Sequence, residues 1–385
     1  MFHSRSLACK KPYGAAPAGE PVEFTVYPRR EHSVSRLTLW VEEDGQQAAA
    51  YPMRWFGLVG ARDRYCASFT PPHSGLYWYW FTFDTADGPR FCARGYGGRS
   101  EVLDSMGDRY QLTVYDPSYQ PPRWFGEGIT YNIFPDRFCR DREPVQPEGE
   151  GIAPRVLHEN WDDLPVYRPD EHGEILNNDF FGGTLRGVME KLDYLESLHV
   201  QTIYFNPIFQ AYSNHRYDTG DYKRIDPLLG SEEDFKTLCE QAKKRGMRVV
   251  LDGVFNHTGY DSRYFNGHGR YDSLGAHQSK DSPYYPWFDF SEWPDKYGSW
   301  WGIYTLAQVN ETDGSYQNYI IEDEDSVVRR WLRAGADGWR LDVADELPDD
   351  FVAGIHAAAR AEKPSAVVIG EVWEDGSTKV AYGVR

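Results

Sequence analysis

Apolar and polar residues alternate with a period of two in the first third of the chain. The alternating segments are short and bounded by turn residues, and no long helical pattern lies between them. They read VEFTVYP, SRLTLWVEE, YCASFT, GLYWYWFTFDT and RYQLTVYD, between about residues 20 and 115. Short strands without helices are typical of a β-sandwich. We therefore predict an N-terminal β-sandwich over residues 1–118, followed by the Pro-rich linker DPSYQPP.

From Ile129 onward, apolar runs of strand length alternate with amphipathic helical segments. The predicted strands are ITYNIFPDRF, VQTIYFNPIF, RVVLDGVFNH, DGWRLDVAD and AVVIGEVW, and the predicted helices are TLRGVMEKLDYLESL, SEEDFKTLCEQAKKRG, SVVRRWLRAGA and FVAGIHAAARAE. The second helix opens with Ser231 and Asp234 at capping-box spacing and closes with Gly246. Strands that alternate with helices form a parallel sheet, so residues 119–385 are predicted to be an α/β domain.

Two connections in this second part are much longer than a sheet of this kind requires. Residues 139–179 are polar and rich in Pro and Gly, and residues 258–322 are rich in aromatic side chains. Long connections within compact domains often carry function. We predict that residues 258–322 form an inserted subdomain over the mouth of an active site.

Composition narrows the class of ligand. The formal net charge of −18 argues against nucleic acid, which needs clustered Lys and Arg. Aromatic residues make up 16% of the chain, which fits either a Tyr-rich core or recognition of sugars. The five cysteines include no CxxC pair, and no run of apolar residues is long enough for a membrane span. We therefore expect a soluble cytoplasmic protein with reduced thiols and a neutral ligand.

Polar residues follow the predicted strands at the edge where parallel strands present catalytic groups. Retaining glycosidases need two carboxylates about 5–5.5 Å apart, and neighbouring strands lie about 4.8 Å apart. Asp342 and Glu371, after the fourth and fifth strands, can meet this requirement. Arg340 lies on the same strand face as Asp342, where it would keep the nucleophile ionised. Glu371, as the proton donor, is expected to be buried beside an anion.

The residues also resemble a known family. LDGVFNH, GWRLDVADE and GEVW are similar to signature segments of the α-amylase superfamily of glycoside hydrolases. YNIFPDRF, GGTLRGVMEKLDYLESL, IYFNPIF, SNHRYDTGDYKRIDP and WWGIYTLAQVN resemble its neopullulanase, cyclomaltodextrinase and maltogenic amylase branch. The resemblance runs from about Trp124 to Arg385. It implies a retaining glycosidase that cleaves α-1,4 bonds, with α-1,6 bonds as a further candidate, in malto-oligosaccharides, cyclodextrins, pullulan or starch.

The resemblance also implies roles for individual residues. Asp342 would be the nucleophile, Glu371 the acid/base, and the substrate would contact Tyr217, His215, His257, Arg340, Glu346 and Trp373. Two alternatives stay open: His257 as a cap of its own strand, and Asp252 as an anchor for Arg340 instead of a catalyst. Branch members often bind calcium after the first strand, but here that position reads CRDR, whose arginines disfavour a cation. No metal or other cofactor is expected.

The chain departs from the family pattern at its end. A Phe-x-x-Asn-His-Asp-like segment, which would carry a third catalytic Asp, does not occur. The expected fold is therefore an incomplete (β/α)8 TIM-type barrel with about five of eight strands, and we expect such a truncated chain to aggregate or lack activity. The alternatives are a glucanotransferase and an inactive glucan-binding fragment. The sandwich resembles a starch-binding module, which implies a homodimer formed through the N-terminal domain.

Overall fold

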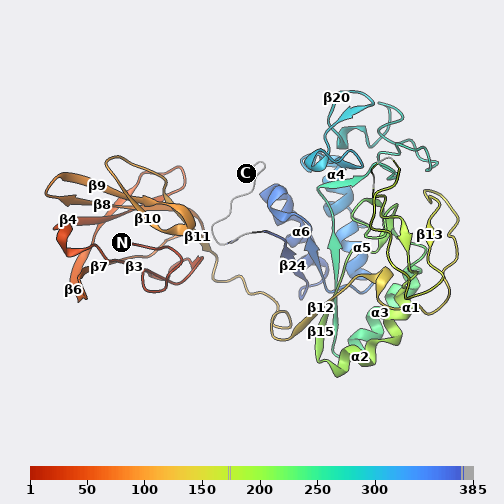
Figure 1. Ribbon diagram of the computed structural model, residues 1–385, viewed down its shortest axis with the longest axis horizontal. Helices are drawn as coiled ribbons and strands as arrows, with labels where there is room; N and C mark the ends of the chain where they lie inside the picture. Colours follow the sequence, from red (N-terminus) through yellow and green to blue (C-terminus); the bar gives the residue numbers. More distant parts are fainter. Residues whose placement is uncertain (172, 174, 374–375, 377–385) are drawn as a thin grey trace. The chain divides into compact units, whose positions relative to one another are not determined.

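The structure is a computed structural model that describes residues 1–171, 173, 175–373 and 376 (Figure 1). The chain divides into two compact units, one containing Met1–Gln120 and the other Pro121–Trp373. The division falls inside the Pro-rich segment DPSYQPP.

Two sheets make up the first unit. The smaller has the order β1 (Lys10–Lys11), β3 (Val22–Val26), β7 (Arg62–Phe69) and β6 (Arg54–Val59). The larger has the order β10 (Ser100–Leu103), β9 (Gly88–Arg94), β8 (Gly75–Thr85), β11 (Tyr110–Tyr115) and β2 (Ala16–Pro17), and β4 (Ser35–Glu43) joins β8 to β5 (Ala49–Pro52). All neighbours are antiparallel except β11 and β2.

The inward residues of both sheets share one buried core. Phe24 of β3 packs against Tyr79 and Phe81 of β8, with ring centroids 4.9 and 6.3 Å away. The alternation that predicted five of these strands is visible in the burial of β3, where Val22, Phe24 and Val26 are buried. The alternation did not predict β1, β2, β5, β6, β9 and β10. Four of these strands have only two to four residues, and β6 and β9 show no regular alternation of buried and exposed positions.

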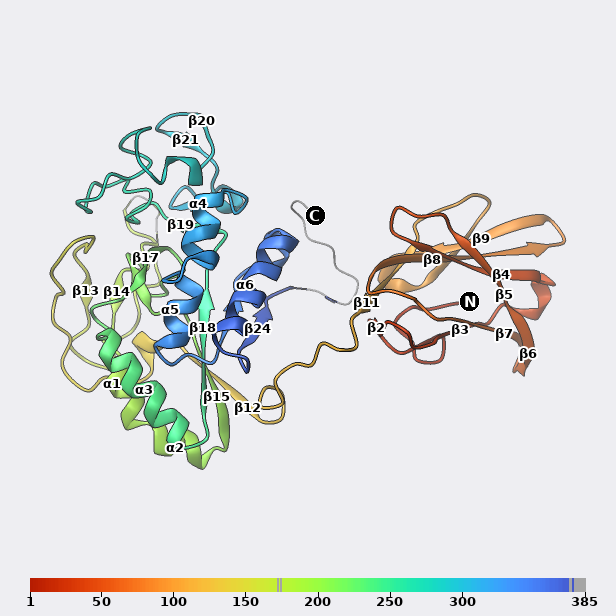
Figure 2. The same cartoon turned by 180° about the vertical axis from the view of Figure 1, so that it is seen from behind.

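A parallel sheet forms the centre of the second unit (Figure 2). Its order is β12 (Ile129–Ile133), β15 (Val200–Phe205), β18 (Arg248–Gly253), β23 (Gly338–Leu341) and β24 (Val367–Gly370). The five predicted strands are confirmed and begin within one residue of the expected positions. Each ends earlier than expected, so the polar residues that terminate the predicted segments lie in the connections beyond the strands.

Helices follow the strands as the pattern predicts, with one difference. The helix expected over 184–198 is two helices, α1 (Leu185–Glu190) and α2 (Leu192–Ser197), because the backbone leaves helical geometry at Lys191 (φ −101°, ψ 6°). α3 (Glu232–Lys244) begins with the expected capping box. α5 (Val327–Arg333) and α6 (Asp349–Glu362) complete the set of predicted helices. No helix in the described part of the chain has the length and apolar character needed to cross a membrane.

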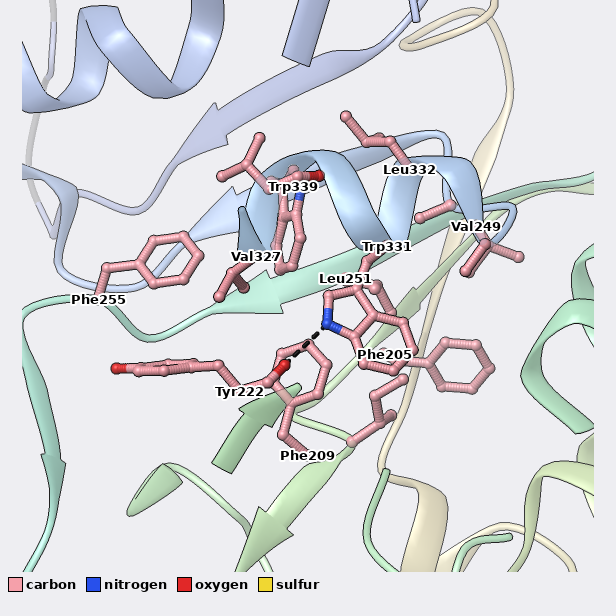
Figure 3. Packing of buried hydrophobic residues seen from close by; sticks show 14 of the residues in the cluster. Phe205, Phe209, Tyr222, Val249, Leu251, Phe255, Val327, Trp331, Leu332 and Trp339 are labelled. Atoms are coloured by element: carbon pink, nitrogen blue, oxygen red, sulfur yellow. Dashed lines mark hydrogen bonds between the residues drawn. The ribbon is translucent and has the colours of Figure 1, made fainter. Parts of the chain in front are cut away.

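The helix α5 packs against the centre of the sheet through aromatic side chains (Figure 3). Trp331 is fully buried, and its indole N–H donates to the carbonyl of Tyr222 at 2.8 Å. Trp339 of β23 is fully buried in the same cluster, and its ring lies 5.6 Å from that of Phe255. Because burying large aromatic side chains is strongly favourable, these contacts stabilise the packing of α5 and β23 in the core of the second unit.

The connections at the carboxyl ends of the strands contain further structure. After β12 come β13 (Val156–Leu157) and β14 (Asp179–Phe180), and after β15 come β16 (Phe209–Ala211) and β17 (Thr219–Ile225). Residues 258–322 lie beyond the end of β18 (Figure 2). They include β20 (Phe290–Glu292), β21 (Lys296–Tyr297), β22 (Leu306–Gln308), α4 (Gly314–Gln317) and a π-helical turn (Asn318–Glu322). The strand β19 (His257–Gly259) begins one residue before this segment. Tyr264, Trp287 and Tyr316 from this insertion belong to the same buried cluster as the sheet. The insertion therefore packs directly onto the core of the second unit.

Candidate active site

Three carboxylates converge on Arg340. Its Nη1 lies 2.7 Å from Asp252 Oδ1 and 2.7 Å from Asp342 Oδ1, and its Nη2 lies 2.9 Å from Glu371 Oε2. The register of the sheet explains this convergence. Asp252 of β18 lies opposite Arg340 of β23, and Asp342 and Glu371 directly follow the paired ends of β23 and β24. Asp252 is thus the anchor of Arg340, as one of the two alternatives expected.

The environment of Asp342 differs from the expectation that Arg340 keeps it ionised. Burial, together with the charge of Asp252, raises the pKa of Asp342 to about 7, against the opposing effect of Arg340. Because the single guanidinium is shared by three carboxylates, it offsets the effect of burial on Asp342 only in part. Burial also raises the pKa of Asp252. Arg340 opposes this rise, and so do the hydroxyls of Tyr204 and Tyr217, which donate to Asp252 Oδ2 at 2.5 and 3.0 Å.

Glu371 is neither fully buried nor placed mainly against an anion, which corrects the second expectation. Its side chain is 29% exposed, and its Oε2 accepts hydrogen bonds from Arg340 and from the backbone N–H of Val343 at 3.0 Å. Val343 adopts the left-handed region (φ 41°, ψ 50°), which is costly for a β-branched residue. This strained turn directs a backbone donor to Glu371.

Tyr217 connects the two predicted histidines to the carboxylates. Its hydroxyl donates to Asp252, its carbonyl accepts from His257 Nε2 at 3.2 Å, and its N–H donates to His215 Nδ1 at 3.1 Å. His257 therefore bonds to a neighbouring segment and does not cap its own strand. Burial lowers the pKa of His257 to about 4, so the ring is neutral at pH 7. Its Nδ1 and the side-chain amide of Asn256 are buried without a protein partner among the described residues.

Two tryptophans of the insertion hold Glu346. The indole N–H of Trp300 donates to Glu346 Oε2 and that of Trp301 to Glu346 Oε1, each at 2.9 Å. Trp300 stacks on His257 with ring centroids 5.4 Å apart, and Trp301 lies 5.6 Å from Trp373. Trp301 and Trp373 are 67% and 64% exposed, so they form an accessible aromatic surface beside the carboxylates. Trp301 has a positive φ of 51°, a second strained position at the site.

All eight predicted site residues thus belong to one connected group. Sequence reasoning did not assign Tyr204, Trp300 or Trp301 to the site. The adjacent tryptophans in an aromatic insertion were a signal, but nothing local connects them to Glu346. In the part of the chain that the structure describes, no three His, Cys, Asp or Glu side chains are arranged to hold a metal ion.

The sequence matches a family model described as the catalytic domain of alpha amylase over residues 132–383, which is more than half of the chain. The chain belongs to the alpha-amylase family. Membership brings the TIM-barrel fold class with it, and the parallel β/α arrangement of the second unit agrees with that class.

Individual relatives are similar over most of this chain. An amylopullulanase of Thermoanaerobacterium saccharolyticum is 35% identical over 403 aligned residues, 96% of this chain and 31% of the relative. The intracellular maltogenic amylase of Bacillus subtilis (strain 168) is 33% identical over 86% of this chain and 53% of its own length. A solved cyclomaltodextrinase matches with a TM-score of 0.60 and 25% identity, over 97% of this chain and 62% of that one. The chain therefore spans between about a fifth and about a half of the length of the curated relatives it matches.

Proposed function

We propose that this alpha-amylase family protein is a retaining glycoside hydrolase that cleaves α-1,4-glucosidic bonds, with α-1,6 bonds as a second linkage. The observation that carries the proposal is the pair Asp342 and Glu371, held by two nitrogens of one guanidinium. Carboxylates positioned in this way can address the same glucosyl unit, as retention requires.

Each carboxylate has a defined task in the proposed reaction. Asp342 attacks the anomeric carbon and forms a covalent glycosyl-enzyme, while Glu371 protonates the departing glycosidic oxygen. Glu371 then removes a proton from water, which attacks the same carbon and releases Asp342. Arg340 orients both groups, and Asp252 with Tyr204 and Tyr217 keeps Arg340 in place.

The proposed substrates are starch-like α-glucans: malto-oligosaccharides, cyclodextrins, pullulan and starch. Relatives named amylopullulanase, maltogenic amylase and cyclomaltodextrinase support this class. The exposed rings of Trp301 and Trp373 support it independently, because an aromatic face suits the apolar face of a pyranose.

Glu371→Gln separates the proposed roles. We expect this variant to lose activity on maltotriose but to keep more activity on an aryl maltoside whose leaving group needs no proton, and azide should restore turnover with that substrate. Asp342→Asn should lose activity on both substrates, and azide should not restore it to the same stereochemical product. Equal losses on both substrates for Glu371→Gln would contradict its assignment as acid/base.

A glucanotransferase is the second candidate, because the covalent intermediate is the same and only the acceptor differs. The aromatic surface formed by Trp301 and Trp373 beside Glu371 supports this second candidate, because that surface offers a place for an acceptor sugar. Products formed at high maltose concentration distinguish the two, because only transfer yields oligomers longer than the substrate.

For the rest of the chain we propose an N-terminal sandwich of the starch-binding type and a TIM-type β/α domain, of which the described residues contribute five parallel strands. The two sheets around one core support the first part, and the five-stranded parallel sheet supports the second. Homodimer formation through the first unit and a cytoplasmic location stay predictions. Sedimentation equilibrium tests the first, since a mass equal to one chain at micromolar concentration would exclude the dimer.

A further inference from the structure

A buried cluster of two arginines and one aspartate lies between the segments that follow β12 and β15. It consists of Arg155, Arg216 and Asp226, whose side chains are at most 1% exposed. Arg155 belongs to the long connection after β12, whereas Arg216 and Asp226 flank β17. Both guanidinium groups lie over the ring of Phe180, at 4.5 and 5.5 Å from its centroid. The cluster thus ties the connection after β12 to the segment after β15.

Arg155 is the main partner of Asp226. Its Nη1 donates to Asp226 Oδ1 and its Nη2 to Asp226 Oδ2, both at 2.7 Å, whereas Arg216 Nη2 lies 3.3 Å from Oδ1. Among the described residues, Asp226 Oδ2 accepts a hydrogen bond only from Arg155. Although burial opposes ionisation, the two guanidinium groups lower the pKa of Asp226 to about 2, so its carboxyl group is ionised at neutral pH. A planar guanidinium that binds both oxygens fixes the orientation of a carboxylate. Arg155 therefore sets the orientation in which Asp226 contacts Arg216.

Arg216 holds a turn of the backbone that leads into the candidate active site. Its φ of 62° lies in the left-handed region, which is unfavourable for a residue with a Cβ atom. Its Nη1 donates to the carbonyl of Asn214 at 2.8 Å, so the side chain closes its own turn. His215 and Tyr217 lie on either side of Arg216 in the sequence, and the hydroxyl of Tyr217 donates to Asp252 at 3.0 Å. Because strained turns persist only where surrounding contacts maintain them, the position of Tyr217 depends on the anchoring of Arg216.

The connection after β12 also binds the residue at the start of this turn. The backbone N–H of Asn214 donates to the carbonyl of Asn177 at 2.7 Å. The side-chain amide of Asn214 donates to the carbonyl of Asp179 at 3.0 Å and to its Oδ1 at 3.1 Å. One end of the turn is therefore held directly by the connection after β12, and the other end is held through Asp226 and Arg155.

We propose that Arg155 is a positioning residue that holds Tyr217 in place on Asp252. It acts through Asp226 and the turn at Arg216. The inference rests on the proposed function for the reaction itself. Loss of Arg155 frees Asp226 to rotate toward Arg216, which draws that guanidinium out of the turn. One guanidinium and one carboxylate then remain, so no unpaired charge is left in the interior.

Arg155→Met, which removes the charge, tests the proposal. It should lower kcat/KM on maltotriose about 30-fold, because a small displacement of a group that supports the reacting residues is costly. Tyr217→Phe keeps the ring but lacks the hydroxyl that donates to Asp252. In a protein that already carries Tyr217→Phe, Arg155→Met should lower kcat/KM by less than about three-fold further, since both changes act on one contact. Losses that multiply in the double variant would assign Arg155 a purely structural role and overturn the proposal, and so would an unchanged kcat/KM in Arg155→Met.

Hydrogen–deuterium exchange followed by mass spectrometry measures the turn without any activity. Arg155→Met should increase the exchange rate of amides in residues 213–218 at least about ten-fold, while peptides from α5 keep the rate of the unaltered protein. An unchanged rate at 213–218, or an equal increase throughout the second unit of a folded variant, overturns the proposal. Should Arg155→Met not fold, Arg155→Lys gives the same comparison, because it keeps the charge but cannot bind both oxygens of Asp226.

Arg248→Met is the matched control. Arg248 forms an ion pair with Asp337 at 3.1 Å, at the amino end of β18 and so at the opposite end of the sheet from the candidate active site. This variant should keep kcat/KM within about two-fold and leave exchange at 213–218 unchanged. A loss equal to that of Arg155→Met would overturn the proposal. Failure of the proposed function is a separate result: the unaltered protein would cleave no α-glucan, while exchange at 213–218 would still decide whether Arg155 holds the turn.

Discussion

The buried carboxyl group of Asp342 makes the stability of this protein depend on pH in an unusual direction. Its pKa of about 7 lies above its ordinary value of 3.8 because of burial and the nearby charge of Asp252. A group with a raised pKa in the folded state stabilises the fold fully below its unfolded pKa. That contribution is lost as the pH rises through the folded pKa, so the free energy of unfolding falls between about pH 4 and pH 7 and stays lower above pH 7.

The perturbation is Asp342→Asn, which keeps the shape and the acceptor for Arg340 but cannot ionise. A shift of about three pKa units corresponds to at most about 4 kcal/mol. We therefore expect the variant and the unaltered protein to have similar free energies of unfolding near pH 4. As the pH rises, the free energy of unfolding of the variant should increasingly exceed that of the unaltered protein, by up to about 4 kcal/mol at pH 8.

Urea denaturation followed by tryptophan fluorescence at five pH values between 4.5 and 8.5 measures this difference. Asp281→Asn, at an exposed aspartate of the insertion, is the matched control and should show a difference that varies little with pH. A stability difference for Asp342→Asn that is constant, or that shrinks as the pH rises, would show that Arg340 keeps Asp342 ionised.

In the unaltered protein the same pKa predicts that kcat/KM on maltotriose rises with pH through about 7, since the nucleophile must be ionised.

Three further predictions concern other contacts. Arg340→Lys should lower kcat on maltotriose about 100-fold, because an ammonium group cannot hold Asp342 and Glu371 in a fixed geometry. An unchanged far-UV circular dichroism spectrum is the control for folding. A near-normal kcat would contradict the role of the guanidinium. Trp301→Phe keeps an aromatic ring but removes the indole N–H that donates to Glu346, so KM should rise about ten-fold with a smaller change in kcat. A fall in kcat alone would argue against a binding role. Ser231→Ala removes the cap of α3 and should cost about 1 kcal/mol in urea denaturation without changing kcat, whereas an unchanged midpoint would mean that the cap contributes nothing.

Local features of the chain were predictable because they depend on residues close in sequence. The period of the apolar residues located the five strands of the parallel sheet, and the spacing of Ser231 and Asp234 predicted the capping box. Since parallel strands present their carboxyl ends at one edge, the same pattern was enough to expect Arg340, Asp342 and Glu371 together. The break at Lys191 was not predictable, because the apolar stripe continues through it.

The sequence by itself thus determined the order of strands and helices and which polar residues follow each strand. Only the tertiary structure decided how their charges and hydrogen bonds are shared. Arg340 serves three carboxylates because β18, β23 and β24 are neighbours in the sheet. Glu346 is held by tryptophans 45 and 46 residues earlier in the chain. Contacts between residues so far apart in sequence depend on how the insertion packs over the sheet. The periodicity of a short segment carries no information about that packing.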